Sequence, residues 1–210
     1  MWIFVDNCGH FQSSSSYIAV IQNPYAPPAA ELADPDALFE QEAPFYVVAP
    51  RKFTTLFFAT LGIYALYWFY RNWVQVRLQG ENVWPWPRAI FQIFFVHDLF
   101  RRVGRHAEQQ GVDLGWAHGR HATLLIILAI VANALDRLSM KEIGTPVTDL
   151  LSYAILVPQW FAFGRAQRYI NLASGDAGGA ANAEFSTANI VWIIFGLCLW
   201  AFVLASLFIE

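Results

Sequence analysis

The stretch that decides the fold is residues 190–209, IVWIIFGLCLWAFVLASLFI, which contains no charged side chain. An apolar helix needs about 20 residues to cross the hydrocarbon core of a bilayer, which is about 30 Å thick. The backbone must satisfy its own hydrogen bonds there, and a continuous apolar run does so as a helix. Residues 190–209 therefore predict a transmembrane helix.

The composition of the whole chain agrees with this prediction. Of 210 residues, 57% are hydrophobic and 14% are charged, whereas soluble domains have about 45–50% and about 25%. So few polar groups could not cover the surface of a soluble domain, and the many aromatic residues exclude a disordered chain. The net charge of −3 does not suggest a nucleic-acid-binding protein, and we expect no nucleic-acid partner.

Three further apolar runs predict helical spans, at residues 53–70, 122–135 and 150–164. Pro158 is expected to kink or break the last of these. A fifth run, residues 89–100, has the length of an interfacial or re-entrant helix. The predicted fold class is therefore all-α: a polytopic transmembrane helix bundle with four spans plus one interfacial or re-entrant helix.

The N-terminal part of the chain differs in composition from the rest. Residues 1–50 are rich in Pro and Ser and contain six acidic residues but neither Lys nor Arg. Such a composition is typical of a disordered segment. The predicted organisation is a disordered acidic tail over residues 1–50, followed by a transmembrane helical domain over residues 51–210.

Basic residues concentrate on the cytoplasmic side of membranes, so their positions predict orientation. With four crossings, nine of the 13 basic residues lie inside and both termini lie outside. With five crossings the N-terminus lies inside, eight basic residues lie inside and five outside, and the acidic tail is not translocated. Both alternatives place residues 101–120 and 165–168 in the cytoplasm.

An arginine-rich segment is interpreted as a membrane-surface patch that contacts anionic lipid headgroups. Each basic residue close to an anionic leaflet contributes about 1 kcal/mol to binding. The patch consists of Arg71, Arg77, Arg88, Arg101, Arg102 and Arg105.

A set of polar residues in or beside the predicted spans forms a candidate polar path for transport, because ionisable groups at membrane depth are functional candidates by default. A simpler interpretation is that Asp98 pairs with Arg101 and Arg102 one helical turn away, and that the amides join helices. The candidate path consists of His97, Asp98, Asn133, Asp136 and Gln159.

Motifs for catalysis, cofactor binding or metal binding are not found in the sequence. It contains no GxSxG, no phosphate-binding glycine loop and no HExxH, and Cys8 and Cys198 are too isolated for a cysteine zinc site. The spacing of His118 and His121 could serve a metal, but further ligands are not suitably placed. We predict a non-enzymatic protein without a cofactor or metal.

Three neighbouring segments carry a more specific pattern: FYVVAPRKF at residues 45–53, TLGIY at 60–64 and YWFYRNW at 67–73. They resemble a family of small bacterial inner-membrane proteins whose first span reads TLG-[IL]-Y…YWFYR-x-W, and the resemblance extends over residues 23–210. It implies a multi-pass location in the bacterial inner (cytoplasmic) membrane. No activity is assigned to that family, so no site residue follows from it. Residues 1–22 are expected to be an upstream extension or to result from a misassigned start site.

These features favour an accessory or assembly subunit of a membrane complex, with a membrane-protein partner or a second copy of the chain. The alternative is a small transporter or channel with a polar path between its helices. The position of His97 and Asp98 separates the two: a water-filled cavity around them favours transport, and the level of the lipid headgroups favours assembly.

Overall fold

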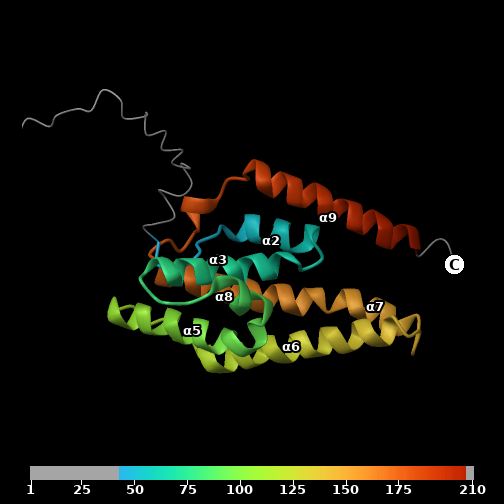
Figure 1. Cartoon of the computed structure of the whole chain (residues 1–210), viewed down its shortest axis with the longest axis horizontal. Helices are drawn as coiled ribbons and strands as arrows, with labels where there is room; N and C mark the ends of the chain where they lie inside the picture. The colour runs from blue at the N-terminus through green and yellow to red at the C-terminus, as the bar shows by residue number, and fades with distance from the viewer. Residues whose placement is uncertain (1–42, 207–210) are drawn as a thin grey trace, which may run out of the picture. The chain divides into compact units, whose positions relative to one another are not determined.

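The computed structural model describes residues 43–206, and all the regular elements in this range are helices (Figure 1). The all-α fold class is thereby confirmed. The four predicted spans are not confirmed, because two of the described helices are long and apolar enough to cross a membrane. These are α6 (His118–Ser139) and α9 (Thr187–Ser206). Most of the predicted tail, residues 1–42, lies outside the described residues.

The single span predicted over residues 53–70 is wrong, because this segment forms two helices. They are α2 (Pro50–Ala59) and α3 (Tyr64–Leu78), which run in opposite directions (Figure 1). The chain reverses at Leu61 and Gly62, whose φ angles of 53° and 81° lie in the left-handed region that ends helices.

The turn between α2 and α3 satisfies its own backbone. The amide of Gly62 donates to the Phe57 carbonyl at 2.9 Å, and that of Ile63 donates to the Thr60 carbonyl at 3.0 Å. The Thr60 hydroxyl accepts from the Tyr64 amide at 3.0 Å. Water is not needed to complete the hydrogen bonds of these amides, which is a requirement for a turn inside a bilayer.

The fifth apolar run is also divided into two helices. They are α4 (Pro85–Ile90) and α5 (Gln92–Gln109), which meet at Phe91. The chain changes direction there, and Arg88 on α4 forms an ion pair with Asp98 on α5 at 3.0 Å. One face of α5 is buried against the other helices and the opposite face is exposed. The buried residues are Val96, Leu99, Phe100, Val103 and Ala107.

The predicted span over residues 150–164 straddles two helices. They are α7 (Val147–Ala154) and α8 (Leu156–Ala173), separated by Ile155 alone. Pro158 explains the interruption, since proline has no amide hydrogen to donate to the carbonyl of Ala154 four residues earlier. The predicted effect of Pro158 is confirmed.

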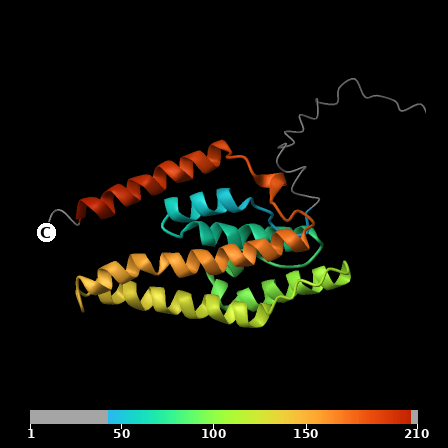
Figure 2. The ribbon, with the colours of Figure 1, turned by 180° about the vertical axis from the view of Figure 1, so that it is seen from behind.

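Helices α7 and α8 together run antiparallel to α6 along its length (Figure 2). At one end the ring of Tyr169 stacks on Trp116, just before α6, with centroids 4.7 Å apart. At the other end the Ser139 hydroxyl donates to the Asp149 carboxylate at 2.5 Å. Helix α6 and the α7–α8 pair therefore form a long antiparallel helical hairpin.

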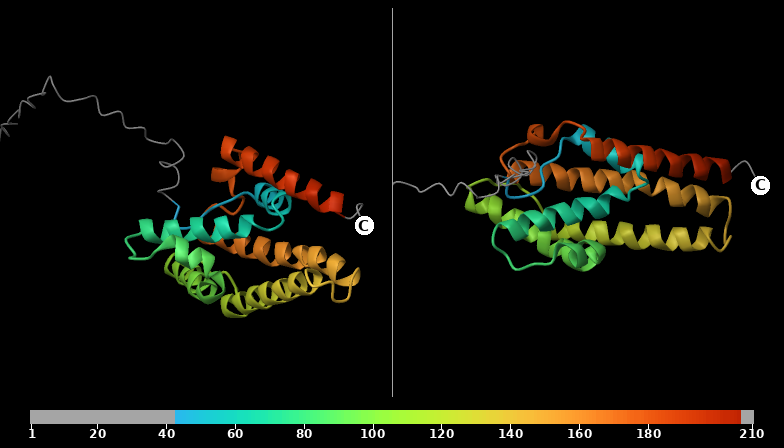
Figure 3. Two further views of the ribbon diagram at one scale, coloured as in Figure 1. Left: turned by 45° about the vertical axis from the view of Figure 1, so that its right-hand side comes forward. Right: turned by 45° about the horizontal axis from the view of Figure 1, so that its top comes forward.

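The last helix, α9, packs against α2, and both views of Figure 3 place the two side by side. It follows the short 3-10 helix η1 (Ala180–Asn182). Gly196 lies so close to the Ala59 carbonyl that a methyl group there would overlap it. The indole of Trp200 donates to the Phe58 carbonyl at 2.8 Å, which ties α9 to the last turn of α2.

The described part of the chain begins with an extended segment, residues 43–49. Its side chains from Phe45 to Val48 are buried in the core. The predicted tail ended at residue 50, so this boundary is placed too far along the chain: residues 45–48 belong to the packed part.

Candidate functional site

Side-chain amides hold the buried extended segment in the way that a neighbouring strand would. The Asn171 amide donates to the carbonyl of Val48 at 2.9 Å and its oxygen accepts from the Val48 amide at 3.2 Å. Gln167, one helical turn earlier, donates to the carbonyl of Tyr46 at 3.0 Å. Asn72 on α3 accepts from the Tyr46 amide at 3.3 Å. A buried backbone without a sheet partner is thereby satisfied.

Helix α3 and the loop after α8 complete this amide cluster. Asn182 donates to the carbonyl of Val47 at 2.9 Å, and Gln79 donates to that of Pro44. The Lys52 ammonium donates to the Asn182 side chain at 2.5 Å. Every one of these contacts joins groups within the fold, so the cluster positions the helices.

Asp98 binds three arginines at once. Its carboxylate accepts from Arg88 at 3.0 Å, from Arg101 at 2.5 Å and from Arg102 at 3.2 Å. Burial raises the pKa of Asp98, but the hydrogen bonds from the arginines outweigh this effect and hold the pKa below its usual range. The predicted pairs with Arg101 and Arg102 are present, and Arg88 is a third partner that sequence spacing did not indicate.

The other candidate path residues do not converge on Asp98. His97 contacts the hydroxyl of Thr123 at 3.2 Å in an exposed position. Asn133 accepts from Arg137 at 2.9 Å on the exposed side of α6, and Asp136 is exposed beside it. The candidate path is therefore not a continuous series of contacts among the described residues.

Gln159 alone among the path residues lines a half-open pocket between the helices. This space of about 110 Å³ lies between α2, α3, α5, α6 and α8. Gln92 also lines it, and the Gln92 side-chain oxygen is buried without a hydrogen-bond partner among the described residues. The remaining lining is mostly apolar, so the pocket is a small half-open space with two amides.

The arginines of the proposed surface patch do not form one surface. Arg77, Arg101 and Arg105 are exposed, but Arg88 lies over the ring of Trp73, 4.4 Å from its centroid. Arg71 is half-buried over the rings of two tyrosines, Tyr46 and Tyr67. The two half-buried cations therefore serve packing as well as charge.

His121 is held on both ring nitrogens. The Trp116 indole donates to Nδ1 at 2.8 Å, and Nε2 lies 2.9 Å from the Ala162 carbonyl, to which it must donate. These contacts fix the neutral tautomer and leave no lone pair for a metal. Within residues 43–206 no three metal-ligating side chains lie together.

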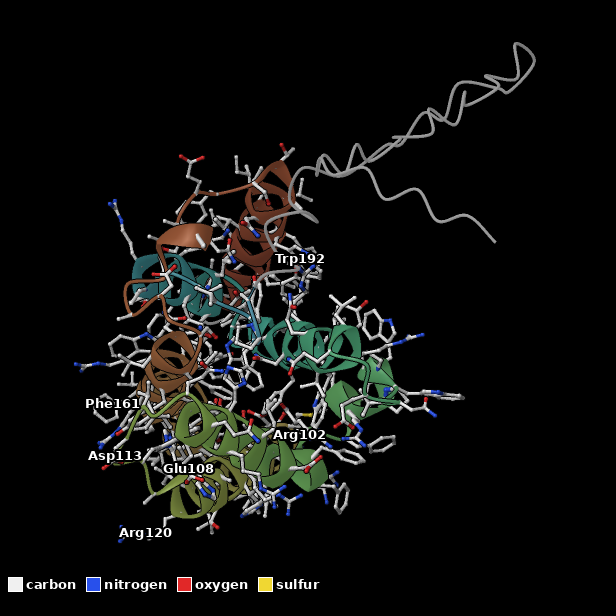
Figure 4. All side chains as sticks on the ribbon, turned by 90° about the vertical axis from the view of Figure 1, so that its left-hand side faces the viewer. Arg102, Glu108, Asp113, Arg120, Phe161 and Trp192 are labelled. Carbon is white, nitrogen blue, oxygen red and sulfur yellow. The ribbon has the colours of Figure 1, made fainter. Side chains whose placement is uncertain are left out.

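Sequence reasoning missed a groove between α2 and α8. It has a volume of about 620 Å³, within the size range of small-molecule sites, about 300–1,000 Å³. Arg165 and Arg168 lie toward one end, where α8 approaches the loop before α6, and Trp160 and Phe161 lie toward the other. Phe161 is 62% exposed and lies on the outer side of α8 in the end-on view of Figure 4. The spacing of the two arginines was visible in the sequence, but the groove depends on how α2 packs.

Comparisons with protein-family models, with curated proteins and with solved structures found no match to the chain.

Proposed function

We propose that the chain is a multi-pass protein of the bacterial inner membrane with three crossings, its N-terminus inside and its C-terminus outside. The crossings are α6, the α7–α8 pair and α9. In this arrangement α2 and α3 form a re-entrant hairpin that enters from the cytoplasm and returns to it. The two apolar helices α6 and α9 carry the membrane assignment, since most of their surface faces outward.

The length of the helices supports the re-entrant hairpin. Its tip contacts Leu156 at the start of α8 through Gly62, and Gly196 in the middle of α9 through Ala59. At about 1.5 Å per residue, α9 continues about 15 Å beyond this level, and α2 begins about 15 Å before it. Because the hydrocarbon core is about 30 Å thick, the tip lies near its middle.

Charge supports the same orientation. This topology places 11 of the 13 basic residues inside, a stronger bias than the nine or eight that the sequence alone suggested. Arg137 and Lys141, between α6 and α7, are outside. Figure 4 views the end assigned to the cytoplasm, where Glu108, Asp113 and Arg120 gather on α5, the next loop and α6. The inside residues are Arg51, Lys52, Arg71, Arg77, Arg88, Arg101, Arg102, Arg105, Arg120, Arg165 and Arg168.

Single cysteines in an otherwise cysteine-free chain test this topology in intact cells with a membrane-impermeant maleimide. Glu142→Cys is expected to react from outside, whereas Ala43→Cys, Asn82→Cys and Gly178→Cys are expected to react only after permeabilisation. Labelling of residue 43 from outside would support four crossings instead, and labelling of residue 82 from outside would support five.

We further propose that this protein is a non-enzymatic accessory or assembly subunit. The carrying observation is that His97 and Asp98 belong to contacts among helices and arginines and line neither the pocket nor the groove. The outward face of α9, which includes Val191 and Phe202, is available to a partner or a second copy.

Photoreactive amino acids in native membranes test this role. At Val191 and Phe202, which are 61% and 76% exposed, we expect adducts with another polypeptide. At Ile193, which packs on the core, we expect adducts within the chain only. If both exposed positions give lipid adducts alone and the chain is a monomer in native membranes, the assembly role is wrong.

A small transporter or channel remains the second candidate, favoured by the half-open pocket with Gln92 and Gln159. Flux through reconstituted liposomes decides it. Transport predicts a solute or proton flux that Gln159→Leu abolishes, with Asn133→Leu as a polar control outside the pocket. Absence of flux in wild-type liposomes would count against this function.

A further inference from the structure

We propose that the groove between α2 and α8 binds one anionic phospholipid of the cytoplasmic leaflet, with its phosphate at Arg165 and Arg168 and an acyl chain along Trp160, Phe161 and Gly164. This inference rests on the proposed membrane topology. It adds a specific ligand site to a protein whose proposed role is assembly.

The first argument is the polarity of the groove along its length. Going from Leu156 toward the end of α8, Trp160 and Phe161 come first, and the two arginines come later. Leu156 lies at the level of the hairpin tip. At about 1.5 Å per residue, Arg165 and Arg168 lie about 13 Å and about 18 Å from the middle of the bilayer. These depths correspond to the edge of the hydrocarbon core, where lipid phosphates begin.

The second argument is the charge at the polar end. Arg165 and Arg168 are three residues apart, so their side chains leave the same face of α8 one turn apart. Both are exposed. The ion pairs among the described residues gather at Asp98 and Glu81, and neither of these two arginines takes part in them. Two adjacent guanidinium groups match the geometry of a phosphate.

The third argument is the shape of the apolar end. A Cβ atom at Gly164 would meet no atom within 4 Å, so the groove is open at this position. Trp160 is held in the wall by its indole, which donates to the Thr54 hydroxyl on α2 at 3.0 Å. A basic pocket between membrane helices on the cytoplasmic side is the arrangement that binds anionic headgroups. Its apolar continuation fits a lipid rather than a free anion.

Native mass spectrometry of the full-length protein in detergent tests the site with phosphatidylglycerol, and with phosphatidylcholine as the lipid of zero net charge. We expect one tightly bound phosphatidylglycerol. The double variant Arg165→Gln/Arg168→Gln is expected to weaken it at least 10-fold. The matched control Arg77→Gln/Arg105→Gln, which removes two exposed arginines elsewhere, is expected to change it less than twofold.

A second variant separates a built site from general attraction. Gly164→Leu keeps both arginines but fills the groove, and we expect it to lose bound phosphatidylglycerol. Gly119→Leu, at an equally open helical glycine, is expected to bind like the wild type. Thermal unfolding of each variant shows that it is folded.

Three outcomes would overturn the proposal. Equal loss of phosphatidylglycerol in both double variants would indicate delocalised surface attraction, and displacement of the lipid by soluble glycerol phosphate would indicate an anion site. Unchanged binding of phosphatidylglycerol in Gly164→Leu would show that the groove does not hold the lipid. The cysteine labelling and photocrosslinking results do not depend on this site, so a failure of the lipid proposal is distinguishable from a failure of the proposed topology or role.

Discussion

The side chain of Asn171 makes two hydrogen bonds to the backbone of a single residue, Val48, which lies 123 positions earlier in the chain. Both partners are completely buried. Asn171 therefore fixes the start of the packed region to α8, and it does so at the base of the hairpin formed by α2 and α3.

Removal of this contact is expected to be costly. Asn171→Ala leaves the amide and the carbonyl of Val48 buried without partners, at about 1–3 kcal/mol for each group. We expect a loss of about 2–6 kcal/mol in the free energy of unfolding in mixed micelles. Asn182→Ala, which removes one part-buried hydrogen bond to the carbonyl of Val47, should lose less. Equal and small losses in the two variants would mean that water replaces the two hydrogen bonds between Asn171 and Val48.

Gly196 lies where α9 contacts α2. Replacing it by alanine has two opposing effects on stability, one through helix propensity and one through packing. Alanine favours a helix over glycine by about 1 kcal/mol. Gly196→Ala nevertheless places a methyl group onto the Ala59 carbonyl, and overpacking of this kind costs about 1–3 kcal/mol. We expect a lower Tm for Gly196→Ala. The matched variant Gly164→Ala, in open space, should have an unchanged or higher Tm; if both variants are stabilised, α9 does not pack on α2 in this way.

The arginine cluster around Asp98 predicts a pH dependence of stability. The three arginines hold the pKa of Asp98 in the folded protein below its value in an unfolded chain. The contribution of Asp98 to the free energy of unfolding is therefore complete above its pKa in the unfolded chain. It is lost as the pH falls through its pKa in the folded protein. Asp98→Asn is expected to lower the unfolding free energy by about 1–2 kcal/mol at pH 7. Unfolding measured between pH 6 and pH 3 should show a smaller loss on acidification for Asp98→Asn than for the wild type. Glu108→Gln, at an exposed position of the same helix, is the control. If the wild type and Asp98→Asn lose the same stability on acidification, the arginines do not stabilise the Asp98 carboxylate.

Continuous apolar runs were the most reliable guide to the fold. They identified α6 and α9, and Pro158 marked the break before α8, because a missing amide hydrogen acts locally. The run over residues 53–70 was misread because its reversal depends on Leu61, a residue that seldom adopts a positive φ. A signal was available: basic residues flank this run on both sides, at Lys52 and Arg71, which suits a hairpin that returns to its starting side.

The contacts at the candidate sites were predictable only where the partners are close in the sequence. The pairing of Asp98 with Arg101 and Arg102 is local in sequence and was predicted. The spacing of Gln167 and Asn171 places them on one face of α8, but their partners are backbone groups more than 120 residues earlier. A sequence pattern does not specify such partners, nor a groove whose second wall comes from α2.

The depth of the hairpin tip tests the central claim most directly. A nitroxide at Ile63→Cys, a 44% exposed position in the tip, can be compared in lipid bilayers with Asn82→Cys in the loop after α3 and Leu197→Cys in the middle of α9. The ratio of accessibility to oxygen and to a water-soluble nickel reagent measures depth. A re-entrant hairpin predicts that residue 63 lies near the middle of the bilayer, as residue 197 does. Accessibility of residue 63 to the nickel reagent equal to that of residue 82 would contradict it.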